Sequence, residues 1–197
     1  MRVIAGTQKG RRLKAPTGNR LRPTSDRVRE ALFSILTGRI PDSKVLDLCC
    51  GTGTVGLEAI SRGAAEVVFV DHHQDSLLVL RENLKRCGNP PEATVLESDA
   101  WKIAREPQFL HYAPFDIIFV DPPYQHQRME QLLCAVGTKQ IITQDGMMIV
   151  EHFWKTSLPA EVGCLQQIRQ ARYGDTVLTF FQQPLDSHAN RHLSRHV

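Results

Sequence analysis

Short apolar runs alternate with helical stretches along most of the chain. The apolar runs cover residues 45–48, 67–70, 94–96, 115–120 and 147–150. Helical spacing of apolar residues marks the segments near 54–62, 75–87, 99–105 and 127–139. This order is typical of βαβ units and predicts an α/β fold with a doubly wound, mostly parallel sheet. Because such crossovers are right-handed, helices should cover both faces of that sheet.

The N-terminal residues follow a different pattern. Basic and apolar residues alternate between Arg2 and Lys14, with breaks at Gly6 and Gly10, which predicts a small basic β-hairpin. Thr24 or Ser25 can then cap a helix. The apolar face of this helix is formed by Val28, Ala31, Leu32, Ile35 and Leu36, and its other face carries Arg27, Arg29 and Glu30.

The C-terminal part returns to strand-like patterns. The runs 165–168 and 176–181, joined through a turn at Gly174, predict a closing antiparallel hairpin. The last residues are polar, and their three regularly spaced histidines have no acidic or Cys partner, so we expect a frayed tail and no metal site. We therefore expect a basic hairpin extension at 1–22, one α/β domain at 23–183 and a polar, disordered tail at 184–197.

The composition is that of an ordinary globular protein. Its 197 residues suit one α/β domain with a small extension, and 42% of them are hydrophobic. No apolar run approaches the roughly 18 to 20 residues of a membrane span, and the first residues lack the apolar stretch of a signal peptide. We expect a soluble, cytoplasmic protein. The five cysteines, which include the adjacent Cys49 and Cys50, show no Cys-x-x-Cys spacing and fit reduced, buried thiols.

Charge is distributed unevenly along the chain. Residues 1–40 contain ten Lys or Arg and two acids, whereas the remaining residues contain fourteen Lys or Arg and nineteen acids. A basic arm on an acidic body suggests a polyanionic partner, although a solvated basic face would give the same count. The candidate contacts to nucleic acid are Lys9, Arg11, Arg12, Arg22 and Arg27.

A glycine-rich turn follows the first apolar run. Gly51-x-Gly53-x-x-Gly56 lets the backbone approach a bound cofactor closely, but it matches the dinucleotide fingerprint as well as a methyltransferase turn. Asp47 separates the two interpretations. Its carboxylate would repel a pyrophosphate, whereas it can face the ammonium group of a methionine moiety. The turn therefore favours S-adenosylmethionine, with S-adenosylhomocysteine as the product.

Two further acids end apolar runs. Asp71 follows the second run, where a carboxylate can accept hydrogen bonds from both ribose hydroxyls of a cofactor. Asp99 follows the third run and can accept a bond from the adenine amino group or cap the next helix, and the sequence does not decide between these roles. We expect the cofactor site to contain Asp47, Gly51, Gly53, Asp71 and Asp99.

The fourth apolar run leads directly into Asp121-Pro122-Pro123-Tyr124. An exocyclic amine of a base is a poor nucleophile, because its lone pair is delocalised into the ring, so a catalyst must orient it. The Asp121 carboxylate and the Pro122 carbonyl can accept its hydrogens, and successive prolines hold these acceptors rigidly. Tyr124 can stack on a base turned out of its helix. We expect Asp121, Pro122 and Tyr124 to be catalytic.

These motifs occur together in a known family. The matching stretches are 2–6, 9–13, 21–33, 47–59, 121–124 and 172–176. They resemble the RsmD family, bacterial methyltransferases that modify guanine N2 in 16S ribosomal RNA. The resemblance implies a seven-stranded class I methyltransferase fold, S-adenosylmethionine as cofactor, and 16S rRNA or the assembling 30S subunit as partner. We expect the enzyme to be a monomer. Relatives usually carry Phe-Ala where this chain has Cys49-Cys50, which should alter packing without loss of cofactor binding.

Three other functions remain open at this stage. N6-adenine methylation of DNA or RNA uses the same chemistry, and Asp-Pro-Pro-Tyr is shared with such enzymes. A NAD-dependent oxidoreductase would explain the glycines but leaves Asp47 and Asp121 without a role. A non-catalytic RNA-binding module on this fold is the third, although the intact glycine turn and Asp121 argue against degeneration.

Overall fold

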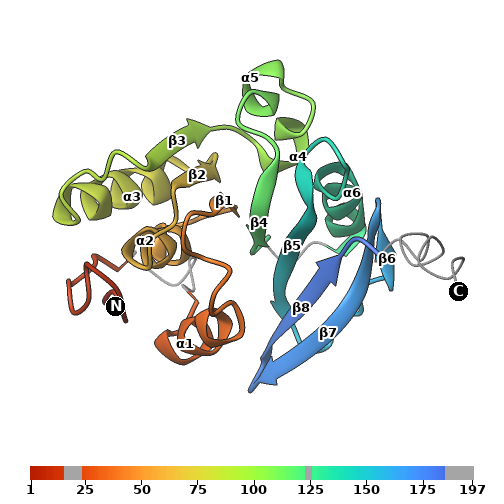
Figure 1. The fold of residues 1–197 in the computed structure, drawn as a ribbon, viewed down its shortest axis with the longest axis horizontal. Helices are drawn as coiled ribbons and strands as arrows, with labels where there is room; N and C mark the ends of the chain where they lie inside the picture. Colours follow the sequence, from red (N-terminus) through yellow and green to blue (C-terminus); the bar gives the residue numbers. More distant parts are fainter. Residues whose placement is uncertain (16–23, 123–125, 185–197) are drawn as a thin grey trace, which may run out of the picture.

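One mixed sheet of eight strands organises the molecule (Figure 1). The structure, a computed structural model, describes residues 1–15, 24–122 and 126–184. The strands are β1 Lys44–Leu48, β2 Glu66–Asp71, β3 Ala93–Glu97, β4 Phe115–Val120, β5 Ile142–Phe153, β6 Glu161–Val162, β7 Leu165–Tyr173 and β8 Thr176–Gln182. The helices are α1 Asp26–Ile35, α2 Thr54–Ser61, α3 Gln74–Arg86, α4 Ala100–Ile103, α5 Pro107–Leu110 and α6 His126–Val136.

The order of the strands places the first strand near the centre of the sheet. The sheet runs β3-β2-β1-β4-β5-β8-β7-β6, with β1 to β5 parallel and β8 antiparallel to both β5 and β7. The predicted doubly wound sheet with a closing hairpin is therefore confirmed. The expected count of seven strands is exceeded by β6, which pairs only two residues with β7. Strand order reverses between β1 and β4, the place where ligands bind in open α/β sheets.

Two hydrophobic layers cover the sheet. Along β4, Ile117 and Phe119 face the layer formed by α1, α2 and α3, while Ile118 and Val120 face α4, α5 and α6. Alternation along a strand directs successive side chains to opposite faces, so a continuous apolar run is buried on both sides. Among the described residues, no helix is long and apolar enough to cross a membrane.

Helix α1 begins where the sequence predicts, but its polar face is different. The Ser25 hydroxyl accepts a hydrogen bond from the Val28 N–H at 3.3 Å, which confirms the cap. The assignment of Arg29 to the polar face is wrong, because its side chain is buried. Its guanidinium donates to the Arg2 carbonyl at 2.6 Å and to Asp26 Oδ1 at 3.0 Å. The N-terminal segment covers this part of the helix, and periodicity within a helix does not reveal such a cover.

Other elements differ from the predicted ones in length. The segment expected to be helical over 99–105 forms the short α4, and a separate α5 follows it. Strand β5 is longer than the apolar run 147–150, because a register shift against β4 accommodates the polar residues before Gly146. Such shifts let a strand continue through residues that otherwise favour turns.

The N-terminal hairpin is closed by an antiparallel bridge and packed against the domain. Arg2 pairs with Arg12, and the Val3 N–H donates to the Arg11 carbonyl at 3.0 Å. The apolar residues Val3 and Leu13 belong to the core on the α1 side. Gly6 has φ +81°, and a Cβ there would lie 1.7 Å from the Ser61 carbonyl oxygen. Only glycine therefore lets the hairpin approach α2 this closely.

One buried carboxylate fastens this hairpin to α2. Glu58 is buried, and its two oxygens accept the N–H groups of Ile4 at 2.7 Å and Ala5 at 3.0 Å. Arg62 Nε also donates to it at 2.7 Å, which balances the buried charge. Both N–H groups come from residues more than fifty positions away in sequence. The first fifteen residues are therefore integrated with the α/β domain, while the predicted boundaries at 22/23 and 183/184 stay predictions.

We expect Glu58→Ala to destabilise the protein by roughly 3 to 5 kcal/mol, because it leaves two N–H groups without their acceptor and the partly buried Arg62 guanidinium without its partner. Urea unfolding measures this loss, and limited proteolysis should then cut within residues 1–15. Glu66→Ala is the matched control, since it removes a half-exposed ion pair with Lys44 and should cost less than about 1 kcal/mol. Equal losses in the two variants would contradict the anchoring role.

Candidate active site at the carboxyl edge of the sheet

Two of the predicted motifs begin side by side on neighbouring strands. The last residues of β1 and β4, Leu48 and Val120, are register partners. The Asp121 N–H donates to the Leu48 carbonyl at 3.3 Å. The glycine turn and the Asp-Pro segment therefore leave the sheet from adjacent strands, which lie about 4.8 Å apart in a sheet.

The glycine turn is held by carboxylates on both sides. The Gly51 N–H donates to Asp71 Oδ2 and the Gly56 N–H to Asp47 Oδ2, each at 2.8 Å. Gly53 is the N-cap residue of α2 and has φ +75°, and a Cβ there would lie 2.3 Å from Leu80 Cδ1. These hydrogen bonds fix the conformation of the turn. Position 53 requires glycine because its φ is positive and because a Cβ would clash with the Leu80 side chain.

The four acids predicted for the site lie near one residue of the glycine turn, Cys49. The pKa of the Cys49 thiol is raised well above its ordinary value, first by burial and then by the charges of Asp71, Asp121, Asp47 and Asp99. Cys49 is the first residue of the glycine turn and has φ +60°. Because one thiol senses all four carboxylates, the structure brings Asp47, Asp71, Asp99 and Asp121 together at this edge.

Two of these acids have raised pKa values of their own. Burial raises the pKa of Asp47 to about 7, although the Gly56 N–H opposes the shift. Burial also raises the pKa of Asp121 well above its ordinary value, and the charges of Glu151 and Asp47 add to the rise. Raised pKa values caused by burial and like charges are common among acids at catalytic and ligand-binding sites.

Sequence analysis missed Glu151 as a member of this cluster. Glu151 follows Val150, the register partner of Val120, so it lies level with Asp121 on the adjacent strand. Its Oε2 accepts a hydrogen bond from the Thr24 hydroxyl at 2.8 Å. The rule that located the other acids also applies to Glu151, because it directly follows the apolar run 147–150.

The remaining predicted site residues have different outcomes. Asp99 caps α4, since its Oδ1 accepts the Trp101 N–H at 2.9 Å, so the helix-capping role is present whether or not it also binds adenine. Asp71 Oδ1 accepts the His73 N–H at 2.8 Å, which leaves lone pairs of both oxygens for ribose hydroxyls. Pro122 is buried and lies two residues after the end of β4. Tyr124 lies outside the described residues, so its stacking role stays a prediction.

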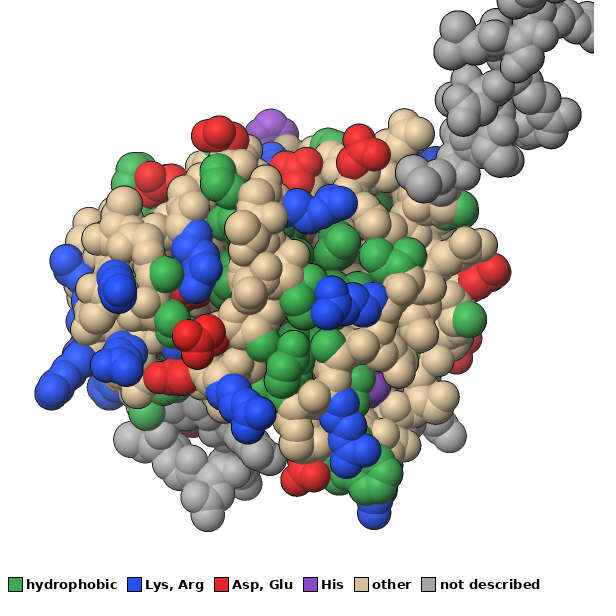
Figure 2. Space-filling view, turned by 60° about the horizontal axis from the view of Figure 1, so that its bottom comes forward, with side chains coloured by type: hydrophobic (Ala, Val, Ile, Leu, Met, Phe, Trp, Pro, Cys, Tyr) green, Lys and Arg blue, Asp and Glu red, His purple; other side chains and the backbone are tan. Residues whose placement is uncertain are grey.

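The basic side chains predicted to contact nucleic acid are exposed where the structure describes them. Lys9, Arg11 and Arg12 lie on the N-terminal hairpin and Arg27 lies on α1. Arg11 is held in place because its guanidinium donates to the Arg86 carbonyl. Figure 2 shows Lys and Arg side chains gathered at its left side, where the N-terminal segment lies in Figure 1. Arg22 lies outside the described residues.

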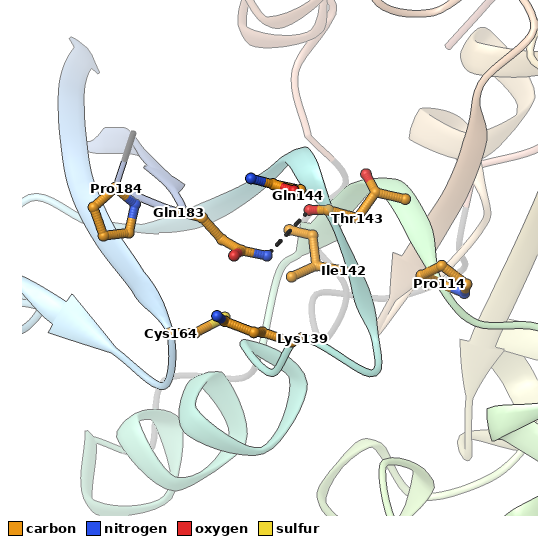
Figure 3. A pocket seen from close by; sticks show the side chains of 8 residues that line it. All are labelled: Pro114, Lys139, Ile142, Thr143, Gln144, Cys164, Gln183 and Pro184. Atoms are coloured by element: carbon orange, nitrogen blue, oxygen red, sulfur yellow. Dashed lines mark hydrogen bonds between the residues drawn. The ribbon is translucent and has the colours of Figure 1, made fainter. Parts of the chain in front are cut away.

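A pocket of about 570 Å³ lies at the opposite edge of the sheet (Figure 3). It is lined by Pro114 and Ile142, where β4 and β5 begin, and by Gln183, which donates to the Thr143 carbonyl at 3.4 Å. The carboxylate cluster lies where these parallel strands end. The pocket is therefore separate from the candidate site.

Comparisons with known proteins identify relatives that match most of the chain. The family described as "Conserved hypothetical protein 95" matches residues 1–182. A protein of Bacillus subtilis (strain 168) named "Putative rRNA methyltransferase YlbH" is 36% identical over 188 residues, 93% of this chain and 99% of that protein. The "Ribosomal RNA small subunit methyltransferase D" of Escherichia coli (strain K12) is 34% identical over 161 residues, 81% of this chain and 78% of that protein.

Solved structures give the same result for the fold. The "Putative methyltransferase yhhF from Escherichia coli" superimposes with a TM-score of 0.80 at 30% identity, covering 93% of this chain and 97% of that one. This similarity confirms the predicted class I methyltransferase fold. Since the family match spans nearly the whole chain, the protein belongs to the "Conserved hypothetical protein 95" family, which is the RsmD family of methyltransferases.

Proposed function

We propose that this methyltransferase uses S-adenosylmethionine to methylate the exocyclic N2 of a guanine in 16S rRNA, free or within the assembling 30S subunit. The names of its relatives support ribosomal RNA as the substrate. The observation that carries the chemistry is the hydrogen bond from the Asp121 N–H to the Leu48 carbonyl. It joins the Asp-Pro acceptors to the start of the cofactor turn, so one pocket can hold both the donor methyl and the acceptor nitrogen.

The residues at the turn fit this cofactor. Asp71 holds the turn through the Gly51 N–H and retains acceptor capacity for two ribose hydroxyls. Asp47 places a buried carboxylate beside the start of α2, where a cationic amino group would be favoured and a pyrophosphate repelled. When bound, S-adenosylmethionine supplies a methyl group already activated by the sulfonium. A nicotinamide dinucleotide would place its phosphates against Asp47, which disfavours the oxidoreductase.

The acceptor side is formed by Asp121 and Pro122. Asp121 accepts a hydrogen of the exocyclic amine and orients its lone pair toward the methyl group, while the Pro122 carbonyl accepts the second hydrogen. Asp121 need not be a strong base, because attack on the methyl produces a cationic amine that loses its proton readily. Adenine N6 offers the same two hydrogens, so N6-adenine methylation is the alternative that nucleoside analysis must exclude.

Calorimetry and mass spectrometry test this proposal. The protein should bind S-adenosylmethionine and S-adenosylhomocysteine, and NADH should show no measurable binding. Mass spectrometry of nucleosides from 16S rRNA should show N2-methylguanosine after incubation with the enzyme, on either the free RNA or 30S subunits that lack the modification. Tight NADH binding without S-adenosylmethionine binding, or methylation found only at adenine N6, would reject the proposal.

We expect reversal of charge at Arg11 and Arg12 to weaken binding of 16S rRNA. Each lost phosphate contact removes counterion release, so the slope of log affinity against log salt should fall by up to about two. Filter binding across a salt series measures the slope. Lys139→Glu provides the control, because this exposed lysine lies beside the pocket at the opposite edge. An equal effect at Lys139 would show that only overall charge matters.

A further inference from the structure

We propose that Trp154, Lys155 and Arg172 form a second contact surface for single-stranded RNA, which we call the Trp154 surface. This surface rests on the proposed function, since it concerns the same substrate. Trp154 follows β5, and Arg172 lies near the end of β7, so the surface joins the strand that carries Glu151 to the β7–β8 hairpin (Figure 1). It is distinct from the N-terminal basic residues.

The geometry holds an exposed indole between cations. Trp154 is 41% exposed, although large aromatic side chains are usually well buried. The Arg172 guanidinium lies 4.4 Å from the centroid of the Trp154 ring and the Lys155 ammonium 5.3 Å from it. Both distances lie within the range of cation–π interactions.

The hairpin turn fixes this arrangement. The Trp154 N–H donates to the Asp175 carbonyl at 2.9 Å, and Arg172 Nε donates to the Gly174 carbonyl at 2.8 Å. The first bond fixes the backbone at Trp154 and the second fixes the Arg172 guanidinium, so the guanidinium has little side-chain entropy left to lose when a ligand binds. Lys155 sits on a flexible stem and can move to a phosphate, which leaves a ring face for a base.

The surface lies close to the candidate active site. Glu151 is level with Asp121, and Trp154 comes three residues later, which corresponds to about 10 Å along extended chain. An enzyme that acts on a base must turn this base out of its stack, so neighbouring nucleotides need other support. A stacking platform three residues beyond Glu151 could support a nucleotide next to the modified one.

The chemistry of the surface favours RNA as the occupant. Unpaired bases stack on aromatic rings and on guanidinium planes, and the two cations match the charge of the flanking phosphates. Figure 2 shows Lys and Arg side chains beside hydrophobic ones at its lower right, on the same face as the basic side chains at its left. A nucleic acid lying across this face would meet basic side chains on both sides of the site.

Steady-state kinetics with 16S rRNA or 30S subunits test the proposal. We expect Trp154→Ala to raise KM for RNA about tenfold with kcat within about twofold, since stacking contributes to binding and not to transfer. Trp154→Phe should restore most of the affinity. Ile168→Ala is the matched control, because Ile168 is an apolar residue of β7 whose exposed fraction, 53%, is similar to that of Trp154. An unchanged KM in Trp154→Ala, or an equal rise in Ile168→Ala, would overturn the proposal.

Fluorescence provides a readout that does not depend on methylation. The chain has two tryptophans, Trp101 and Trp154. A short single-stranded RNA should quench emission in the Trp101→Phe variant and leave it unchanged in Trp154→Phe, whereas polyglutamate should not quench either. If polyglutamate quenches Trp154, or if RNA does not quench it, the proposed RNA-binding role of the Trp154 surface is rejected. If RNA quenches Trp154 but the wild-type protein methylates no RNA, the proposed function fails and the surface stands.

Discussion

Asp121→Ala is expected to lower the rate of methyl transfer by about a hundredfold or more, while the dissociation constant for S-adenosylhomocysteine changes by less than about threefold. The first effect follows because Asp121 orients the amine, and removal of one preorganised polar group at a reacting centre commonly costs this much. The second follows because the contacts that fix the cofactor turn come from Asp47 and Asp71. Single-turnover assays and calorimetry measure the two quantities separately.

Asp121→Asn is the informative companion variant. The amide keeps the shape of the side chain and one acceptor oxygen, so we expect Asp121→Asn to be more active than Asp121→Ala. Its rate should not depend on the ionisation of residue 121. Loss of cofactor binding together with retained turnover in Asp121→Ala would show that Asp121 belongs to the cofactor site. A loss of both activity and folded structure would be detected by unfolding experiments on the same samples.

The pH dependence of the wild-type enzyme supplies a second check on Asp121. Burial, Glu151 and Asp47 raise its pKa, so the carboxyl group stays protonated to a higher pH than an ordinary Asp. Because the ionised form accepts the amine hydrogen, kcat/KM should rise with pH through this raised pKa. Glu151→Gln removes a neighbouring like charge and should shift the rising limb to lower pH. If the rising limb of kcat/KM lies at the same pH in Glu151→Gln and wild type, the charge of Glu151 does not influence the ionisation of Asp121.

Much of the site could be predicted because of how parallel sheets are built. Asp47 lies within the first strand and Asp71 ends the second, while Asp121 follows the fourth. In a parallel sheet these carboxyl ends meet at one edge, so short apolar runs in the sequence are enough to group the acids. The partners of Asp121 on β5 follow the same logic, and Glu151 carried the same signal in the sequence.

The rest depends on contacts between residues distant in sequence. Glu58 and Arg29 are charged residues on helices, where they are usually solvated, yet both are buried against backbone groups of the N-terminal hairpin. No local pattern indicates such a cover. The cluster of Trp154 and Arg172 likewise forms only when the β7–β8 turn meets the end of β5. Helical or strand periodicity reports which face is apolar and does not report what covers it.

Binding of S-adenosylhomocysteine is expected to release close to one proton near pH 6 and almost none at pH 8.5. Asp47 has a pKa of about 7 in the protein without ligand, so its carboxyl group is mostly protonated at pH 6. The ammonium group of the cofactor favours the ionised form, which must lose this proton on binding. Calorimetry in two buffers of different ionisation enthalpy measures the release, and affinity should rise between pH 6 and 8.

Asp47→Asn should abolish this pH dependence and weaken cofactor binding by roughly tenfold to a hundredfold, because a charge-assisted contact is lost. The Asn oxygen can still accept the Gly56 N–H, so the turn should keep its shape. Methylthioadenosine, which lacks the amino acid part, is the control ligand: its affinity should not change with pH or with this substitution. Proton release on binding of methylthioadenosine would assign the titration to another group.

The same substitution should stabilise the ligand-free protein at high pH. A folded-state pKa of about 7, above the unfolded value near 3.8, means that the neutral form favours folding at low pH. This contribution is lost as pH rises through 7 and amounts to something on the order of 4 kcal/mol. Asp47→Asn should therefore gain stability relative to wild type between pH 4 and 8 in urea unfolding. A constant difference across this range would mean that Asp47 is already ionised in the free protein, and the site would then bind its cofactor without releasing a proton.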